Sequence, residues 1–244
     1  MVGRPDVKIF RSVDTYPIKG VDVSHFSDDV DLFKLRAADI RFVNAKATQG
    51  AHLYDPKYTK YAAEAASAGI PFGAYHFFET CVSPWEQFQN LQSKVPNDAD
   101  LLPISVVVEW EVKPGAPMSI IRPCAEAKNN LESFLKLIQS HYGKIPIVYT
   151  ASTFIREYGI VDETFNRYPL WIADFSRRSI RAGKPSLPGT NPWTLWQTTD
   201  SARIPGISRP VDLNVFFGSE AEFQEFRNGK GNPALIAALR KPAP

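Results

Sequence analysis

A run of nine residues near the middle of the chain constrains the fold more than any other segment. Leu102 to Trp110 reads Leu-Pro-Ile-Ser-Val-Val-Val-Glu-Trp, with only Ser105 and Glu109 polar. Such a β-branched run is typical of a strand buried on both faces, as in a parallel sheet covered by helices. A carboxylate that closes a buried strand lies where α/β barrels and open α/β sheets keep their catalytic residues. Glu109 is therefore either a catalytic acid or a solvated strand-end residue.

The rest of the chain alternates between short apolar strands and helical segments. Further strands are expected at 20–24, 41–46, 70–78, 145–150, 170–174, 193–197 and 211–216. Helices are expected at 31–38, 55–69, from 83, from about 119 to 141, after 152, and from 219. The pattern predicts an α/β protein, a single irregular TIM-like β/α barrel with about five β/α units followed by three strands with little helix. Residues 1–18 are interpreted as an extended leader, 19–228 as the barrel and 229–244 as a C-terminal tail.

The composition restricts the partners of the protein. Hydrophobic residues make up 44% of the 244 residues, enough for one barrel core, and a net charge of +2 is too small to indicate a nucleic-acid partner. The four histidines lack metal-site spacing, so we expect no metal and no cofactor. Cys81 and Cys124 are either two free thiols or one disulfide.

Neither a membrane span nor a signal peptide is expected from the sequence. No apolar run approaches the roughly 18 residues that a transmembrane helix needs. The stretch from Met1 to Asp6 precedes no apolar segment of the kind found in signal peptides. The protein is therefore expected to be cytosolic, or secreted or located in the periplasm or cell envelope after removal of an export segment.

Three acidic residues lie at comparable places on predicted strands. Asp22 is on the first strand, Glu109 on the fourth and Asp212 on the last. Because the first and last strands of a closed barrel are neighbours, Asp22 and Asp212 should lie close together, with Glu109 across the mouth. Such a cluster suits glycoside cleavage, in which one carboxyl group donates a proton and others stabilise the cationic sugar. Acids at strand ends also commonly cap loops.

Seven segments, in order, resemble the lysozymes of glycoside hydrolase family 25, the Chalaropsis-type N-acetylmuramidases. They are 20–26 (GVDVSHF), 46–50 (KATQG), 69–78 (GIPFGAYHFF), 102–110 (LPISVVVEW), 141–150 (HYGKIPIVYT), 195–200 (LWQTTD) and 205–216 (PGISRPVDLNVF). The resemblance implies an irregular β/α barrel that hydrolyses the β-1,4 bond from N-acetylmuramic acid to N-acetylglucosamine in peptidoglycan. It also implies that Glu109 is similar to the general acid of the family, with Asp22 and Asp212 at matching acidic positions.

The departures from the family pattern concern the same groove. Val107 replaces the Asp of the family's Asp-x-Glu, Gln49 replaces a Glu, and Ser27 stands where a Gln is usual. Residues two apart on a strand share a face, so Val107 should point into the same mouth as Glu109. Either Glu111 supplies the missing charge and a weakened enzyme remains, or catalysis is lost and the barrel binds peptidoglycan strands or a protein partner.

Aromatic and polar residues complete the set of candidates. By resemblance, Tyr75, Tyr149 and Trp171 lie near the substrate groove and could stack on sugar rings, while Gln49 and Asp174 are polar candidates for substrate binding. Trp110 should face away from Glu109 and pack under the helices. The arginines at 177, 178 and 181 are either a solvated charge run or contacts for the carboxylates of the peptide stem.

Overall fold

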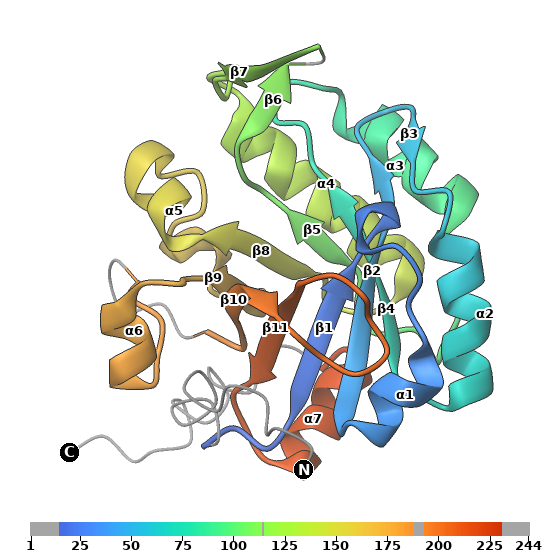
Figure 1. The fold of residues 1–244 in the computed structure, drawn as a ribbon. Coiled ribbons are helices and arrows are strands. Elements are labelled where there is room, and N and C mark those ends of the chain that lie inside the picture. Colours follow the sequence, from blue (N-terminus) through green and yellow to red (C-terminus); the bar gives the residue numbers. More distant parts are fainter. Residues whose placement is uncertain (1–14, 114, 188–192, 231–244) are drawn as a thin grey trace.

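The computed structural model describes residues 15–113, 115–187 and 193–230. Eight strands form a closed barrel in which β11 pairs with β1 (Figure 1). In barrel order they are β1 (Lys19–Val23), β2 (Ile40–Gln49), β4 (Phe72–Phe77), β5 (Ser105–Val107), β8 (Ile147–Ala151), β9 (Leu170–Ala173), β10 (Leu195–Ala202) and β11 (Val211–Phe216). The predicted α/β class and single irregular barrel are confirmed.

The direction of the strands explains where helices occur. The neighbours from β1 through β2, β4, β5, β8 and β9 to β10 are parallel, and parallel strands need a crossover connection. The helices are α1 (Leu32–Ala37), α2 (Tyr58–Ala68), α3 (Pro84–Lys94), α4 (Ala127–Tyr142), α5 (Ser152–Tyr158), α6 (Arg177–Ala182) and α7 (Glu220–Arg227), with short 3₁₀ turns η1 (His25–Ser27) and η2 (Glu163–Phe165). Strand β11 is antiparallel to both β10 and β1, so the last third of the barrel needs little helix.

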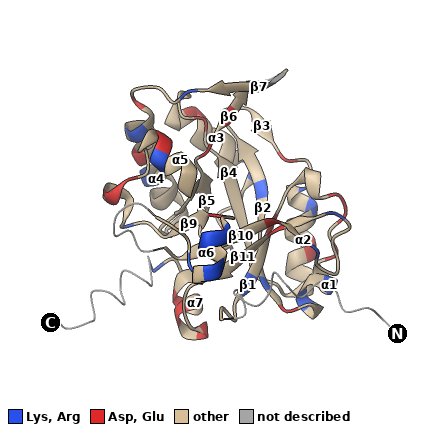
Figure 2. Ribbon diagram, turned by 60° about the vertical axis from the view of Figure 1, so that its left-hand side comes forward, with Lys and Arg blue, Asp and Glu red and all other residues tan. Residues whose placement is uncertain are grey.

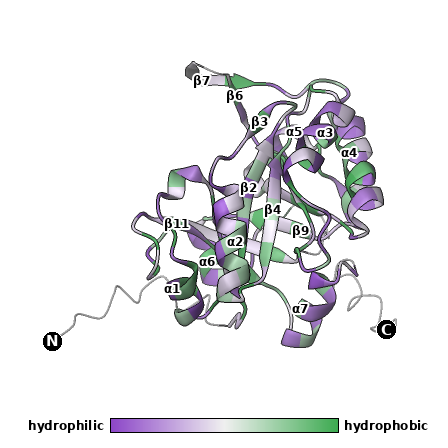
Figure 3. Cartoon of the chain, turned by 90° about the vertical axis from the view of Figure 1, so that its right-hand side faces the viewer, coloured by the Kyte–Doolittle hydropathy of each residue, from purple (hydrophilic) through white to green (hydrophobic). Residues whose placement is uncertain are grey.

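The helices cover the barrel with apolar faces. In α4 the buried residues recur every three or four positions, at Ala127, Leu131, Phe134, Leu135, Ile138 and Tyr142. The ring of Phe134 stacks on Phe78, just after β4, at 5.2 Å between centroids. Hydrophilic residues occupy much of the outer surface of the helices in Figure 3. Burial between strands and helices therefore holds the barrel wall in place.

The central run differs from the expected nine-residue strand. Only Ser105–Val107 pair as β5, and the chain then bends at Glu109 into a hairpin of β6 (Glu111–Lys113) and β7 (Ala116–Ile121). The helix expected from about residue 119 begins at Ala127, because Pro123 disfavours helical backbone at the residue before it. This hairpin projects beyond the barrel at the top of Figure 1.

The structure bears on the expectations about the two cysteines, about membrane-spanning helices and about the ends of the chain. Cys81 and Cys124 are free thiols that lie together, and the backbone N–H of Cys124 donates to Cys81 Sγ at 3.0 Å. Among the described residues no helix has the length and apolarity to cross a membrane, and no group of three or more His, Cys, Asp or Glu could hold a metal ion. Most of the predicted leader and tail lies outside the described residues, although Ile18 is buried.

Candidate active site

A cleft of about 920 Å³ opens where the parallel strands end. Its volume is near the upper end of the range of about 300–1,000 Å³ typical of ligand sites. The cleft is lined by Asp22, Tyr75, Phe77, Val107, Glu109, Trp110, Tyr149, Ala151, Ser152, Thr153, Arg156, Trp171, Ala173, Asp174, Phe175, Ser176, Arg178, Ser186, Gln197, Asp200 and Asp212. The structure therefore brings Asp22, Glu109 and Asp212 into one cleft.

Asp22 and Asp212 form the floor of the cleft at the seam of the barrel. They are directly opposite each other in the antiparallel pairing of β1 with β11. Asp22 Oδ2 accepts hydrogen bonds from Asn214 Nδ2 at 2.7 Å and from Gln197 Nε2 at 2.9 Å. The expectation that barrel closure makes Asp22 and Asp212 neighbours is confirmed.

Two amide side chains hold the Asp22 carboxylate and are themselves held by aromatic residues. The Tyr149 hydroxyl donates to Gln197 Oε1 at 2.9 Å, and the Trp171 indole N–H donates to Asn214 Oδ1 at 2.8 Å. Each amide oxygen is thus used as an acceptor, which leaves each NH₂ group to donate toward Asp22. The aromatic residues therefore orient the donors that face Asp22.

Asp22 and Asp212 are close enough that the ionisation of one disfavours the ionisation of the other. Burial raises the pKa of Asp22, whereas the hydrogen bonds from Asn214 and Gln197 favour its ionised form. Burial also raises the pKa of Asp212, and the negative charge of Asp22 raises it further. Because two adjacent carboxylates do not both ionise easily, these effects favour the proton on Asp212 and the negative charge on Asp22.

Glu109 lies across the cleft in a different environment. It follows β5, is half-buried, and its carboxyl group takes part in no hydrogen bond within the described residues. Burial raises its pKa to about 7, the charge of Asp22 acts in the same direction, and the Lys46 ammonium opposes them. Glu109 is therefore substantially protonated near neutral pH, as a proton donor must be.

Val107 faces the cleft beside Glu109, as the two-residue spacing predicts. It pairs with Phe77 of β4 on one side and Tyr149 of β8 on the other, and is 5% exposed. Its methyl groups pack in an apolar cluster that includes Tyr75, Phe77 and Tyr149. This part of the wall therefore offers hydrocarbon to a ligand, where a carboxylate would offer charge.

Glu111, which supplies the missing charge in one of the two alternatives, is not among the residues that line the cleft. Its Oε1 atom accepts hydrogen bonds from the backbone N–H and the hydroxyl of Thr80, both at 2.6 Å, and the residue is 8% exposed. The prediction assumed that the strand continues past Glu109, but the bend there ends the alternation that would have put both glutamates on one face. Glu111 anchors the β6 strand to the segment after β4.

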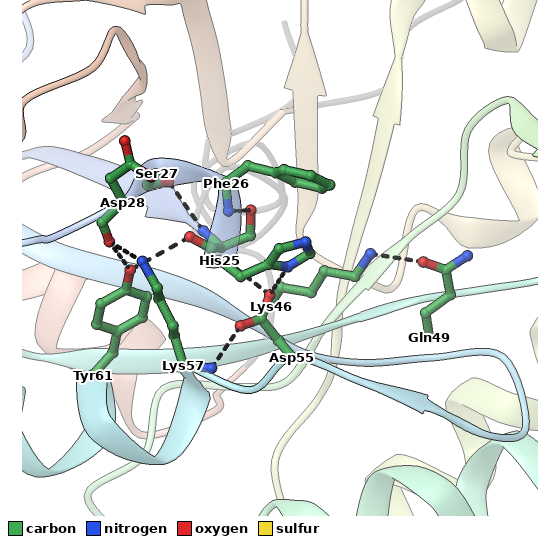
Figure 4. Close-up of polar contacts among 10 residues, drawn as sticks. His25, Phe26, Ser27, Asp28, Lys46, Gln49, Asp55, Lys57 and Tyr61 are labelled. Carbon is green, nitrogen blue, oxygen red and sulfur yellow. Dashed lines mark hydrogen bonds and ion pairs between the residues drawn. The ribbon is translucent and has the colours of Figure 1, made fainter. Parts of the chain in front are cut away.

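Gln49 also lies beside the cleft and is not among its lining residues. Its Oε1 accepts from Lys46 Nζ at 2.7 Å, and its Nε2 donates to Glu79 Oε1 at 3.2 Å. Figure 4 shows the Lys46 side chain extending from beside the buried Asp55 to Gln49. Asp55 accepts a hydrogen bond from His25 Nδ1 at 2.7 Å. In this arrangement Gln49 orients the Lys46 ammonium, whose positive charge reaches Glu109.

Asp174 and Trp110 line the cleft in unexpected ways. The two carboxylate oxygens of Asp174 accept from Ser176 N at 3.0 Å, Ser179 Oγ at 2.6 Å and Ser186 N at 2.8 Å. Asp174 is thus occupied with holding the start of α6 and the loop after it. Trp110 was predicted to face away from Glu109 and pack under the helices. It does pack against α5, with its ring in edge contact with Phe154 at 5.3 Å between centroids, and its indole N–H donates to Glu157 at 3.1 Å. Because the chain has left the strand, the residue also lines the cleft.

The three aromatic candidates differ in how much surface they offer. Trp171 is 1% exposed and Tyr149 is 8% exposed, with their rings in edge contact at 4.9 Å between centroids. Tyr75 is half-buried. The structure thus favours Tyr75 over Tyr149 and Trp171 as a surface for sugar stacking.

Several residues of the site were not predicted from the sequence. Gln197 and Asn214 hold Asp22, and Phe175, Arg156 and Asp200 line the cleft. Asn214 could have been found, because it lies two positions after Asp212 and therefore on the same face of β11. Arg156 lies on a helix and carries no comparable signal.

Comparisons with known proteins found relatives that match most of the chain. Residues 21–207 match the family described as "Glycosyl hydrolases family 25", a range that ends before β11. The uncharacterized protein YegX of Escherichia coli K12 is 32% identical over 93% of this chain and 80% of its own length. Lysozyme M1 of Streptomyces globisporus is 26% identical over 92% of this chain and 76% of its own.

Solved structures of the same family superpose on the barrel. A family 25 glycosyl hydrolase from Bacillus anthracis is 30% identical, with a TM-score of 0.76 over 88% of this chain and 95% of its own. A bacterial lysozyme from Streptomyces coelicolor is 26% identical, with a TM-score of 0.76 over 88% of this chain and 99% of its own. The similarity therefore covers nearly the whole described barrel.

Proposed function

Because the chain belongs to glycosyl hydrolase family 25, a family of muramidases that act on peptidoglycan, we propose that it cleaves the β-1,4 bond between N-acetylmuramic acid and N-acetylglucosamine. One observation supports this assignment above the others. A carboxyl group that burial keeps protonated, Glu109, shares a cleft with an ionised carboxylate, Asp22. Paired acids in opposite protonation states are what glycoside hydrolysis requires. The proposed substrate places its action in the cell wall, outside the cytoplasm.

The chemistry divides between the two sides of the cleft. Glu109 donates its proton to the glycosidic oxygen as the bond to the muramic acid carbon breaks, and a water molecule then adds to that carbon and returns a proton to Glu109. Asp22, held by Gln197 and Asn214, stabilises the positive charge that develops on the sugar. Protonated Asp212 donates to Asp22 and so keeps the negative charge on that residue.

Val107 makes this a slow enzyme. At the position where the family has an aspartate, the wall is apolar, and Glu111 is bound to Thr80. Removing one preorganised charged group typically costs about 3–4 kcal/mol in the barrier, or roughly a hundred- to thousandfold in rate. Proton donation by Glu109 does not depend on the missing group, so hydrolysis continues at a reduced rate.

The same apolar wall favours a second candidate function, binding of peptidoglycan without cleavage. The two functions are separated by incubating the protein with insoluble peptidoglycan and measuring both pelleting and new reducing ends at muramic acid. Release of muropeptides by the parent protein but not by Glu109→Gln supports hydrolysis. Pelleting with no new reducing ends, even after prolonged incubation, would support the binding function and refute the proposed one.

A further inference from the structure

The wall of the cleft opposite the acidic floor carries positive charge. Arg156 of α5 and Arg178 of α6 both line the cleft, although they come from helices that follow different strands, β8 and β9. In Figure 2 much of the ribbon of α6 is blue, the colour of Lys and Arg, and Figure 1 places α5 and α6 on the same side of the barrel. Two arginines thus converge on one cavity from separate elements.

Neither arginine is neutralised within the described residues. No ion pair there involves Arg156 or Arg178, and both side chains are exposed, whereas Arg41 pairs with Glu220 at 3.0 Å and Arg167 with Glu132 at 3.6 Å. Asp174, the buried acid closest to them in sequence, has both oxygens engaged by serines and by backbone N–H groups. The two guanidinium groups are therefore available to a ligand.

The neighbours of the arginines suit a peptide more than a bare sugar ring. Four small hydroxyl-bearing residues, Ser152, Thr153, Ser176 and Ser186, also line the cleft. Phe175, 43% exposed, adds an apolar surface beside them. Arginine and small hydroxyl side chains bind carboxylates and amide groups, and the planar guanidinium can hold a carboxylate with two parallel hydrogen bonds.

We propose that Arg156 and Arg178 bind the carboxylates of the peptide stem attached to muramic acid, so that the cleft selects glycan that still carries its stems. This inference rests on the proposed function in that it takes peptidoglycan as the ligand of the cleft. Unsubstituted glycan lacks these distal carboxylates and would leave the two arginines unused. The selection therefore operates through charge on the outer wall, separately from proton transfer by Glu109.

The test measures binding, so that it does not depend on catalysis. Glu109→Gln protein is titrated with a soluble disaccharide tetrapeptide, N-acetylglucosaminyl-N-acetylmuramyl-tetrapeptide, and with the same compound after its carboxylates are converted to methyl esters. Adding Arg156→Gln and Arg178→Gln together should weaken binding of the free acid about fivefold, the sum expected for two exposed charge pairs. Binding of the ester should be the same with and without the two substitutions.

A matched control comes from α6, the helix that carries Arg178. Arg177 and Arg181 also lie on α6 but do not line the cleft, so Arg177→Gln with Arg181→Gln should leave both affinities unchanged. The inference is overturned if the Arg156 and Arg178 double variant binds the free acid as tightly as its parent, if it loses as much affinity for the ester, or if the parent binds neither compound.

The outcomes separate this inference from the proposed function. Charge-dependent binding in a protein that releases no muropeptides would retain the stem-binding site and refute hydrolysis. If the protein hydrolyses peptidoglycan but its affinity for the free acid does not change when both arginines are substituted, hydrolysis is supported and the stem-binding site is refuted.

Discussion

The acids on the two sides of the cleft differ in protonation state because their surroundings differ. At the seam of β1 and β11, Asp22 receives hydrogen bonds from two amides and stays ionised at the expense of Asp212. Beyond β5, Glu109 receives none, and burial beside Val107 keeps its proton on near neutral pH. The paired strands β10 and β11 carry the amide donors Gln197 and Asn214 that face Asp22. The chain leaves the sheet after β5, and within the described residues no paired strand presents a donor to Glu109. The comparison shows that donors, more than the kind of acid, decide which group can give up a proton.

The largest effect is expected from removing the proton of Glu109. Glu109→Gln keeps the shape of the side chain but cannot transfer a proton, so the rate should fall by at least about a hundredfold, the lower range for general acid catalysis. The measurement is the rate of appearance of reducing ends at muramic acid. Glu111→Gln is the comparison variant, and a loss as large from that change would contradict the separate placement of the two glutamates.

The floor is tested by neutralising its two aspartates one at a time. Asp22→Asn removes the ionised group and should lower kcat about a hundred- to thousandfold. Asp212→Asn keeps a hydrogen-bond donor toward Asp22 and should lower kcat less. The ratio of the two kcat values decides the assignment, and a larger loss in Asp212→Asn would place the negative charge on Asp212.

The pH dependence of hydrolysis should identify Glu109 as the group that must be protonated. Because its pKa in the free protein is about 7, kcat/KM should decline above that pH, by about tenfold per pH unit. Lys46 lowers the pKa of Glu109, so Lys46→Gln should shift this limb to higher pH. A pH profile that does not respond to Lys46→Gln would show that another group causes the decline.

Stability should respond in opposite directions to changes at the two glutamates. The pKa of folded Glu109 is raised from 4.5 to about 7, so the folded state loses stability as pH rises between these values. At pH 8, Glu109→Gln should therefore increase the free energy of unfolding by about 1–3 kcal/mol. Glu111→Ala leaves the N–H of Thr80 without its acceptor and should decrease that free energy by about 1–3 kcal/mol. Urea unfolding at pH 8 measures both.

Much of the fold, and the neighbourhood of Asp22 and Asp212, could be predicted from the pattern of apolar residues in the sequence. Apolar runs separated by helical segments predict the barrel, and closure of the barrel predicts that Asp22 meets Asp212. The hairpin of β6 and β7 was missed because apolar residues continue past β5, although Pro114-Gly115 is a turn signal in the sequence. The placement of Glu111 depends on where the pairing of β5 ends, and the pattern of residues in the sequence does not indicate that position. The donors to Asp22 depend on the register between β10 and β11.

Restoring the missing charge tests the central claim most directly. We propose that the apolar wall at Val107 limits hydrolysis, while Glu109 and Asp22 remain in position to act. Val107→Asp should then raise kcat about a hundred- to thousandfold, with Val107→Asn, which restores polarity without charge, giving a much smaller increase. Reducing-end formation by Val107→Asp at the rate of the parent protein, in a variant that remains folded, would contradict it.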